Sequence, residues 1–118
     1  MTKEDSVEKC RQVTVAVKKA FLDNAVSAFN SSKIPQDDNS FSEIHFWYPG
    51  KAISGQVTID FSSASRAQIK IVSKNVDGDT KRILFSSDEQ FSLRKFQEGL
   101  NTSLSQIAEK KINWVLKI

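Results

Sequence analysis

A strict alternation of residue types between Ile53 and Phe61 constrains the fold of this chain more than any other feature of its sequence. The odd positions are apolar or small and the even positions are polar: Ile53, Gly55, Val57, Ile59 and Phe61 alternate with Ser54, Gln56, Thr58 and Asp60. Successive side chains of a β-strand point to opposite faces, so this segment is expected to lie in a sheet with one buried face and one solvated face.

Three more strands are predicted around this one, over residues 41–48, 66–74 and 80–85. The Pro49-Gly50 pair is typical of a turn between the first two strands. Gly78 tolerates positive φ between the last two. Together these signals predict an antiparallel meander of four strands.

Apolar residues at steps of three and four predict one helix on each side of the strands, because this spacing places them on one helix face. The first helix is expected to run from about Lys3 to Phe29, and the second to follow candidate N-caps at Ser86 and Ser87. The predicted fold class is therefore α+β: a four-stranded antiparallel β-meander flanked by an N-terminal and a C-terminal long helix, with both helices on one face of the sheet. The apolar stripes comprise Cys10, Val13, Val17, Phe21, Ala25 and Ala28 in the first helix and Leu93, Phe96, Leu100, Leu104 and Ile107 in the second.

The chain is predicted to form a single domain over 1–118, with a helix in 1–30, a mobile loop in 31–40, the sheet in 41–86 and a helix with a tail in 87–118. The tail is ambiguous, because Ile112–Ile118 fits both the alternation of a strand and an extension of the helix. Continued helix is favoured, since no Gly or Pro interrupts the chain after Ile107.

The register of the strands follows from pairing inward residues with inward residues. Val57 then faces Ile44 on one side and Ile71 on the other, and Ile71 faces Ile83. The solvated face is expected to gather two aromatic rings, three cations and one leucine: Trp47, His45, Lys70, Lys74, Arg82 and Leu84.

Catalytic motifs are absent from the sequence. His45 is the only histidine, and Cys10 lies on the predicted buried stripe, so no spacing typical of a metal site occurs. The four glycines are isolated and form no phosphate-binding loop. The protein is therefore predicted not to be an enzyme and to need no cofactor or metal.

The predicted solvated face suggests a function in binding, as a small adaptor subunit in a protein complex. Tryptophan and arginine often anchor protein interfaces, so a protein partner or a second copy of the chain is expected there. The alternative is RNA or single-stranded nucleic acid, whose bases stack on aromatic rings while cations hold the phosphates. A third interpretation is a solvated sheet face with one half-exposed tryptophan.

The order of helix, four-strand meander and helix resembles RWD-type adaptors, signal-recognition-particle Alu-binding subunits and ribosome hibernation factors in topology. The Tyr48-Pro49 pair is similar to the tyrosine-proline motif of RWD domains, but it follows the first strand here and the second proline is missing. This resemblance is one of topology only and transfers no individual residues.

Charge and composition suggest an intracellular protein, either cytoplasmic or nuclear. The net charge of +3 permits contact with nucleic acid or an acidic partner and requires neither. No apolar stretch approaches the roughly 20 residues that cross a bilayer, and Met1–Asp5 leads into no apolar segment, so neither membrane insertion nor a signal peptide is expected. The single cysteine agrees with a reducing compartment.

Overall fold

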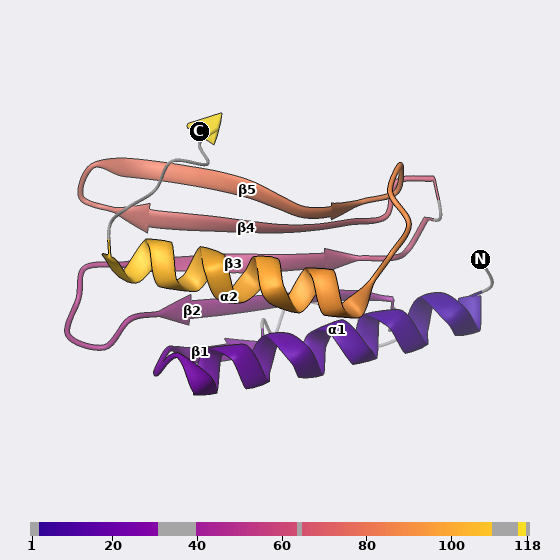
Figure 1. The fold of residues 1–118 in the computed structure, drawn as a ribbon, viewed down its shortest axis with the longest axis horizontal. Helices are drawn as coiled ribbons and strands as arrows, with labels where there is room; N and C mark the ends of the chain where they lie inside the picture. Colours follow the sequence, from indigo (N-terminus) through magenta and orange to yellow (C-terminus); the bar gives the residue numbers. More distant parts are fainter. Residues whose placement is uncertain (1–2, 31–39, 64, 110–115, 118) are drawn as a thin grey trace.

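The computed structural model describes residues 3–30, 40–63, 65–109 and 116–117. Two helices pack on one antiparallel sheet, which confirms the α+β class (Figure 1). The elements in chain order are α1 (Lys3–Asp23), β1 (Ser27–Asn30), β2 (Phe41–Trp47), β3 (Ser54–Asp60), β4 (Gln68–Asn75), β5 (Gly78–Ser86), α2 (Leu93–Glu109) and β6 (Leu116–Lys117).

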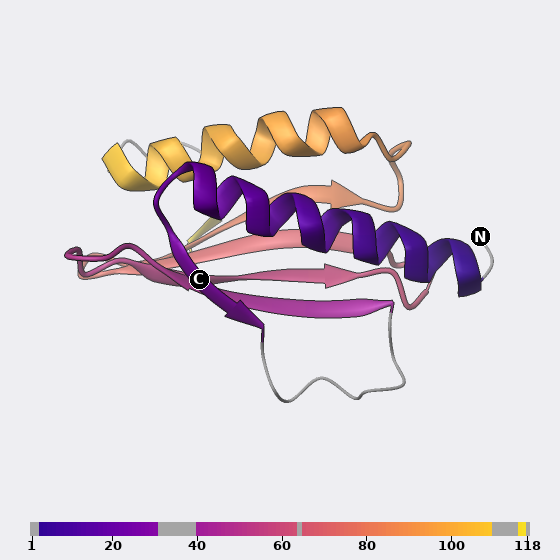
Figure 2. The same ribbon diagram turned by 90° about the horizontal axis from the view of Figure 1, so that it is seen from below.

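The sheet has six strands in sequential order, two more than the sequence predicted. The four expected strands are present as β2 to β5, and the short strands β1 and β6 extend the sheet at its two edges. Both helices lie on the same face and leave the other face uncovered, as Figure 2 shows. Helix α1 packs over β1 to β3, α2 packs against β5, and the two helices contact each other.

The core lies between this sheet face and the helices. The predicted pairing of Val57 with Ile44 and Ile71 is present, and all three side chains are fully buried. Helix α1 contributes the buried stripe of Cys10, Val13, Val17 and Phe21, and α2 contributes Phe96, Leu100, Leu104 and Ile107.

Gly55 permits a close contact at the centre of the sheet. It pairs with Phe46, whose ring covers the space that a side chain would occupy, as the sequence pairing suggested. A Cβ atom at this position would collide with the carbonyl oxygen of Val72 as well as with that ring. Glycine is required here by packing, because backbone of the neighbouring strand has no room to retreat.

Helix α1 ends at Asp23, so the prediction of a helix to Phe29 was wrong. The amide of Val26 donates to the carbonyl of Phe21 at 2.8 Å, and the amide of Ala25 donates to Leu22 at 3.2 Å. This is the Schellman pattern, in which the residue after the helix adopts positive φ. Ala25 does so at φ 56° without being glycine. Val26 is buried and starts the path into β1, which pairs with β2.

A β-bulge in β5 overturns part of the predicted register. Ile69 pairs with Phe85 as expected, but Lys70 pairs with Ile83, which leaves Leu84 without a partner opposite. Beyond the bulge the facing of β5 is therefore inverted. Ile83 points outward and Arg82 inward, whereas the sequence prediction had Ile83 inward and Arg82 outward.

Helix α2 begins at Leu93, later than the sequence suggested. Its N-cap is Ser92, whose hydroxyl accepts a hydrogen bond from the amide of Lys95 at 3.3 Å. Ser86 is instead the last residue of β5, and its carbonyl accepts from the amide of Glu89 in the turn that follows. The helix ends at Glu109, and Leu116–Lys117 pairs with β5 as a strand, so helix continuation over 116–117 was wrong. Residues 31–39 of the mobile loop predicted at 31–40, and residues 110–115 and 118 of the tail, lie outside the described residues. Ser40, the last residue of that loop, is buried, and its carbonyl accepts from the amide of Phe61 at 2.8 Å.

Tyr48 links the end of β2 to α2. Its hydroxyl donates to the carbonyl oxygen of Leu104 at 2.8 Å, and Lys51 donates to Ala108 from the same turn at 3.2 Å. Burial raises the pKa of the Tyr48 phenol, because the charged phenolate loses its hydration there.

Leu100→Ala is expected to lower the free energy of unfolding by about 2–5 kcal/mol, the range for a fully buried leucine. Thr58→Ala, on the uncovered face, should cost far less. Chemical denaturation measures both, and similar unfolding midpoints would show that the two faces are assigned wrongly.

Ala25→Gly is expected to stabilise the protein by roughly 0.5–1 kcal/mol, because glycine removes the steric cost of positive φ at the helix end. Ala20→Gly is the matched control, since Ala20 lies inside α1 and its replacement should destabilise the fold by about 1 kcal/mol or more. Thermal unfolding distinguishes them; a destabilised Ala25→Gly protein would contradict the proposed helix end.

Ionisation of Tyr48 is expected to coincide with alkaline unfolding. Its folded pKa is raised, so its stabilising effect is complete below the unfolded pKa of about 10 and is lost as the pH rises above it. Tyr48 is the only tyrosine, so phenolate absorbance reports it alone. An absorbance transition near pH 10 that precedes the loss of circular dichroism would mean that the phenol is solvated.

Candidate functional site

Three aromatic side chains meet on the uncovered face of the sheet. The ring of Phe29 stacks on His45 with centroids 5.3 Å apart and an interplanar angle of 15°. Phe29 also contacts Trp47, at 5.9 Å between centroids. The contacts follow from the register, since Phe29 pairs with His45 and Ser27 pairs with Trp47 across β1 and β2. We call Phe29, His45 and Trp47 the aromatic cluster.

The aromatic cluster is open to solvent. Phe29 is 55% exposed and Trp47 is 43% exposed, although each ring has a neighbouring ring in contact. Val72 lies in the same cross-strand row as His45, and Ile83, 39% exposed, follows in the next row. The uncovered face therefore carries a band of aromatic and apolar groups, interrupted by the polar Gln56 between His45 and Val72, that no described residue covers.

Charges of both signs surround this band. The register places three lysines and three carboxylates on the uncovered face, so the formal charges of its described side chains cancel. Lys74 pairs with Asp79 across β4 and β5, and Glu43 approaches His45 at 3.4 Å between Oε1 and Nε2. The six charged residues are Lys70, Lys74, Lys81, Glu43, Asp60 and Asp79.

Two of the six residues predicted for this face lie elsewhere. Arg82 points toward α2, where its Nη1 donates to the hydroxyl of Ser103 at 3.0 Å. Leu84, at the bulge, is partly buried and packs against the core. The face does hold Trp47, His45, Lys70 and Lys74, as predicted.

Phe29, Lys81 and Ile83 belong to this face and were missed by the sequence analysis. Phe29 was assigned to the first helix because nothing in the sequence announced the helix end at Asp23. The other two residues follow the bulge, which reverses their facing. The one strand signal in this segment is the alternation of apolar Val26 and Ala28 with Ser27, which would place Phe29 on the outward face. It spans only four residues.

Among the described residues, no group of three His, Cys, Asp or Glu side chains is placed to hold a metal ion. Cys10 is buried in the core, and His45 has a ring on one side and a carboxylate nearby. In the same part of the chain, no helix is both long and apolar enough to cross a membrane.

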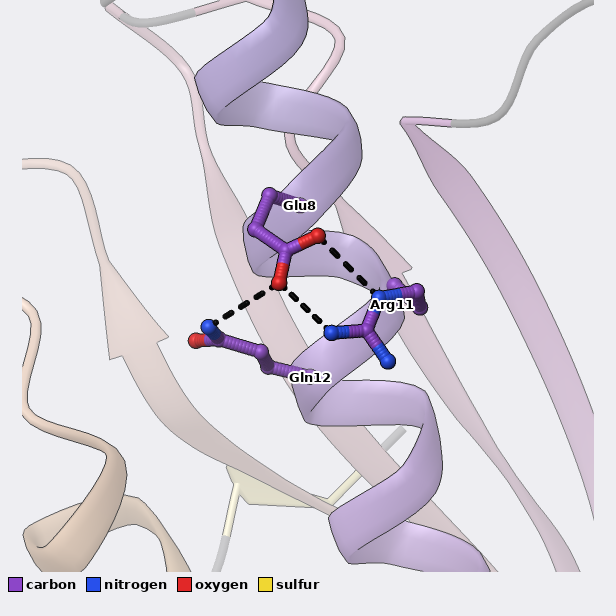
Figure 3. Close-up of polar contacts among 3 residues, drawn as sticks. All are labelled: Glu8, Arg11 and Gln12. Carbon is purple, nitrogen blue, oxygen red and sulfur yellow. Dashed lines mark hydrogen bonds and ion pairs between the residues drawn. The ribbon is translucent and has the colours of Figure 1, made fainter.

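A group of three polar side chains lies on α1, on the opposite side of the sheet from the aromatic cluster (Figure 2). The Glu8 carboxylate accepts hydrogen bonds from Arg11, at 2.6 Å and 3.1 Å, and from Gln12 at 3.3 Å (Figure 3). The bonds from Arg11 lower the pKa of Glu8. All three residues lie within four positions of one helix, and the ion pair is exposed, so the group stabilises the helix surface locally.

The chain matches no protein-family model, and no curated protein or solved structure is significantly similar to it.

Proposed function

We propose that this protein is a non-enzymatic interaction module that acts as a small adaptor subunit of a protein complex. It binds its partner through the uncovered sheet face, with the aromatic cluster at the centre. The observation that carries this proposal is the contact among Phe29, His45 and Trp47 on a face that neither helix covers.

Energetics favour a protein partner for such a cluster. Single exposed apolar residues are common on soluble proteins, but two large exposed rings that touch each other form a patch. Tryptophan and other aromatic residues supply a large share of the binding energy at protein interfaces, because a rigid ring buries much area for little lost entropy. Phe29 and Trp47 meet this description.

The charges favour protein over nucleic acid. A nucleic-acid surface owes much of its affinity to cations that displace counterions from phosphates. Here three carboxylates accompany the three lysines, and Arg82 is directed to Ser103 on the helix side. Mixed charges around an apolar centre are instead the usual rim of a protein interface.

Trp47→Ala is expected to weaken binding of the partner by about 2 kcal/mol or more, roughly 30-fold in affinity. The partner is obtained by affinity capture from native extract, identified by mass and measured by titration. Val76→Ala is the matched control, because Val76 is 83% exposed in the turn between β4 and β5, away from the cluster. Equal affinities for the two variants would contradict the proposal.

Salt dependence tests the nucleic-acid alternative. Partner affinity should change little between low and physiological salt, and labelled mixed-sequence single-stranded RNA should not bind with saturation. A steep fall in RNA affinity with salt, reduced further by Lys74→Ala, would instead show phosphate contacts and replace the protein partner by nucleic acid.

A further inference from the structure

An apolar hollow of about 670 Å³ lies between the C-terminal half of α1 and β1. Leu22 and Lys18 line it from the helix, and Val26, Ala28, Phe29 and Trp47 line it from β1 and its neighbours. Within β1, the side chain of Ala28 lies on the helix side of the sheet and that of Phe29 lies on the uncovered side. A hollow that touches both faces of one edge strand must pass along the edge of that strand.

Strand β1 is the last strand of the sheet on this side. Within the described residues, only β2 pairs with it, so one row of its backbone N–H and C=O groups points away from the sheet. Such a row is a template for another extended chain, because each group can pair in the geometry of the ladder.

The helix does not close over this edge. Ala28 pairs with the fully buried Phe46 but is itself exposed, and Leu22 on α1 is 78% exposed. The space between the helix and the edge strand is thus open and lined by apolar groups. Apolar side chains that alternate along an added strand would enter it from the helix side.

The charge of the hollow selects among occupants. Lys18 is the single ionisable side chain among the described residues that line the hollow, so it favours a segment that carries a carboxylate. A second copy of this chain is less suitable. A two-fold contact brings the same patch of both copies together, so two Lys18 ammonium groups would share one interface with no carboxylate among the residues that line the hollow.

We propose that the edge of β1 binds an extended segment of the partner protein, which joins the sheet as an additional strand beside Ser27–Asn30. Its alternate apolar side chains fill the hollow between α1 and β1, and an acidic side chain lies beside Lys18. The inference rests on the proposed function, because Phe29 and Trp47 line both the hollow and the partner-binding face.

The test uses three acetylated and amidated peptide probes with alternating valine and threonine. One contains a central glutamate, one a central lysine, and one a central proline that lacks the N–H needed for pairing. Amide chemical shifts of the whole protein are recorded during titration. The glutamate peptide is expected to shift the β1 amides, and the proline peptide is expected not to bind.

Lys18→Glu tests the charge. The wild type should prefer the glutamate peptide over the lysine peptide by roughly three- to fivefold, the effect of a partly exposed ion pair. Lys18→Glu should reverse this preference, whereas the matched control Lys19→Glu, outside the lining of the hollow, should keep it. Equal binding of all three peptides, no binding of any, or a dimer of the free protein in light scattering would overturn the inference.

Failure of the inference is separable from failure of the proposed function. Ile83→Glu changes the uncovered face and lies outside the hollow, whereas Lys18→Glu changes the hollow alone. If Ile83→Glu weakens partner binding while the peptides do not bind at β1, the proposed function stands and the added strand is wrong. If the peptides bind at β1 while Ile83→Glu and Trp47→Ala leave the partner bound, the uncovered face is not the binding face.

Discussion

The packing of two helices against a single face of the sheet is the interaction on which the rest of this structure depends. Helices α1 and α2 each present one apolar stripe, and burial of both stripes requires the same sheet face. The side chains of Val57, Ile59 and Ile71 are fully buried there. Since neither α1 nor α2 covers the other sheet face, the large apolar groups Phe29 and Trp47 on it stay exposed in the described part of the chain (Figure 2). The packing of the helices does not require Phe29 and Trp47 to be exposed, so their exposure needs another explanation, such as a partner.

The β-bulge in β5 and the hydrogen bond of Arg82 to α2 determine which β5 side chains lie on the uncovered face. The bulge at Leu84 directs Arg82 to Ser103, whose hydroxyl in turn donates to the carbonyl of Gly99 at 2.8 Å. Together with the bond from Tyr48 to Leu104, this holds α2 in place on the sheet. The same bulge exchanges Arg82 for Lys81 on the uncovered face and turns Ile83 and Asp79 onto it. One local irregularity thus leaves the number of cations on the expected surface unchanged and adds one carboxylate to it.

The edge at β1 depends on how α1 ends. The Schellman turn at Ala25 releases Val26 into the core and directs the next residues along β2, so a four-residue strand forms beside the helix it follows. Helix α1 packs over β1, β2 and β3 but leaves Leu22 and Ala28 exposed at this edge. The proposed partner segment and the aromatic cluster therefore share one origin in the last turn of the first helix.

The sequence by itself determined the class of the fold and the register of β2, β3 and β4, because strict alternation allows one facing only. It also placed Trp47, His45, Lys70 and Lys74 correctly, since they lie on these strands. Tertiary structure alone decided the facing of Arg82 and Ile83. Ile83, Leu84 and Phe85 are three consecutive apolar residues, so the pattern fits either phase, and packing against α2 selects the bulged one. Tertiary structure also decided the end of α1, because Ala25 has no intrinsic preference for positive φ and adopts it only where burial of Val26 against Phe21 compensates the cost.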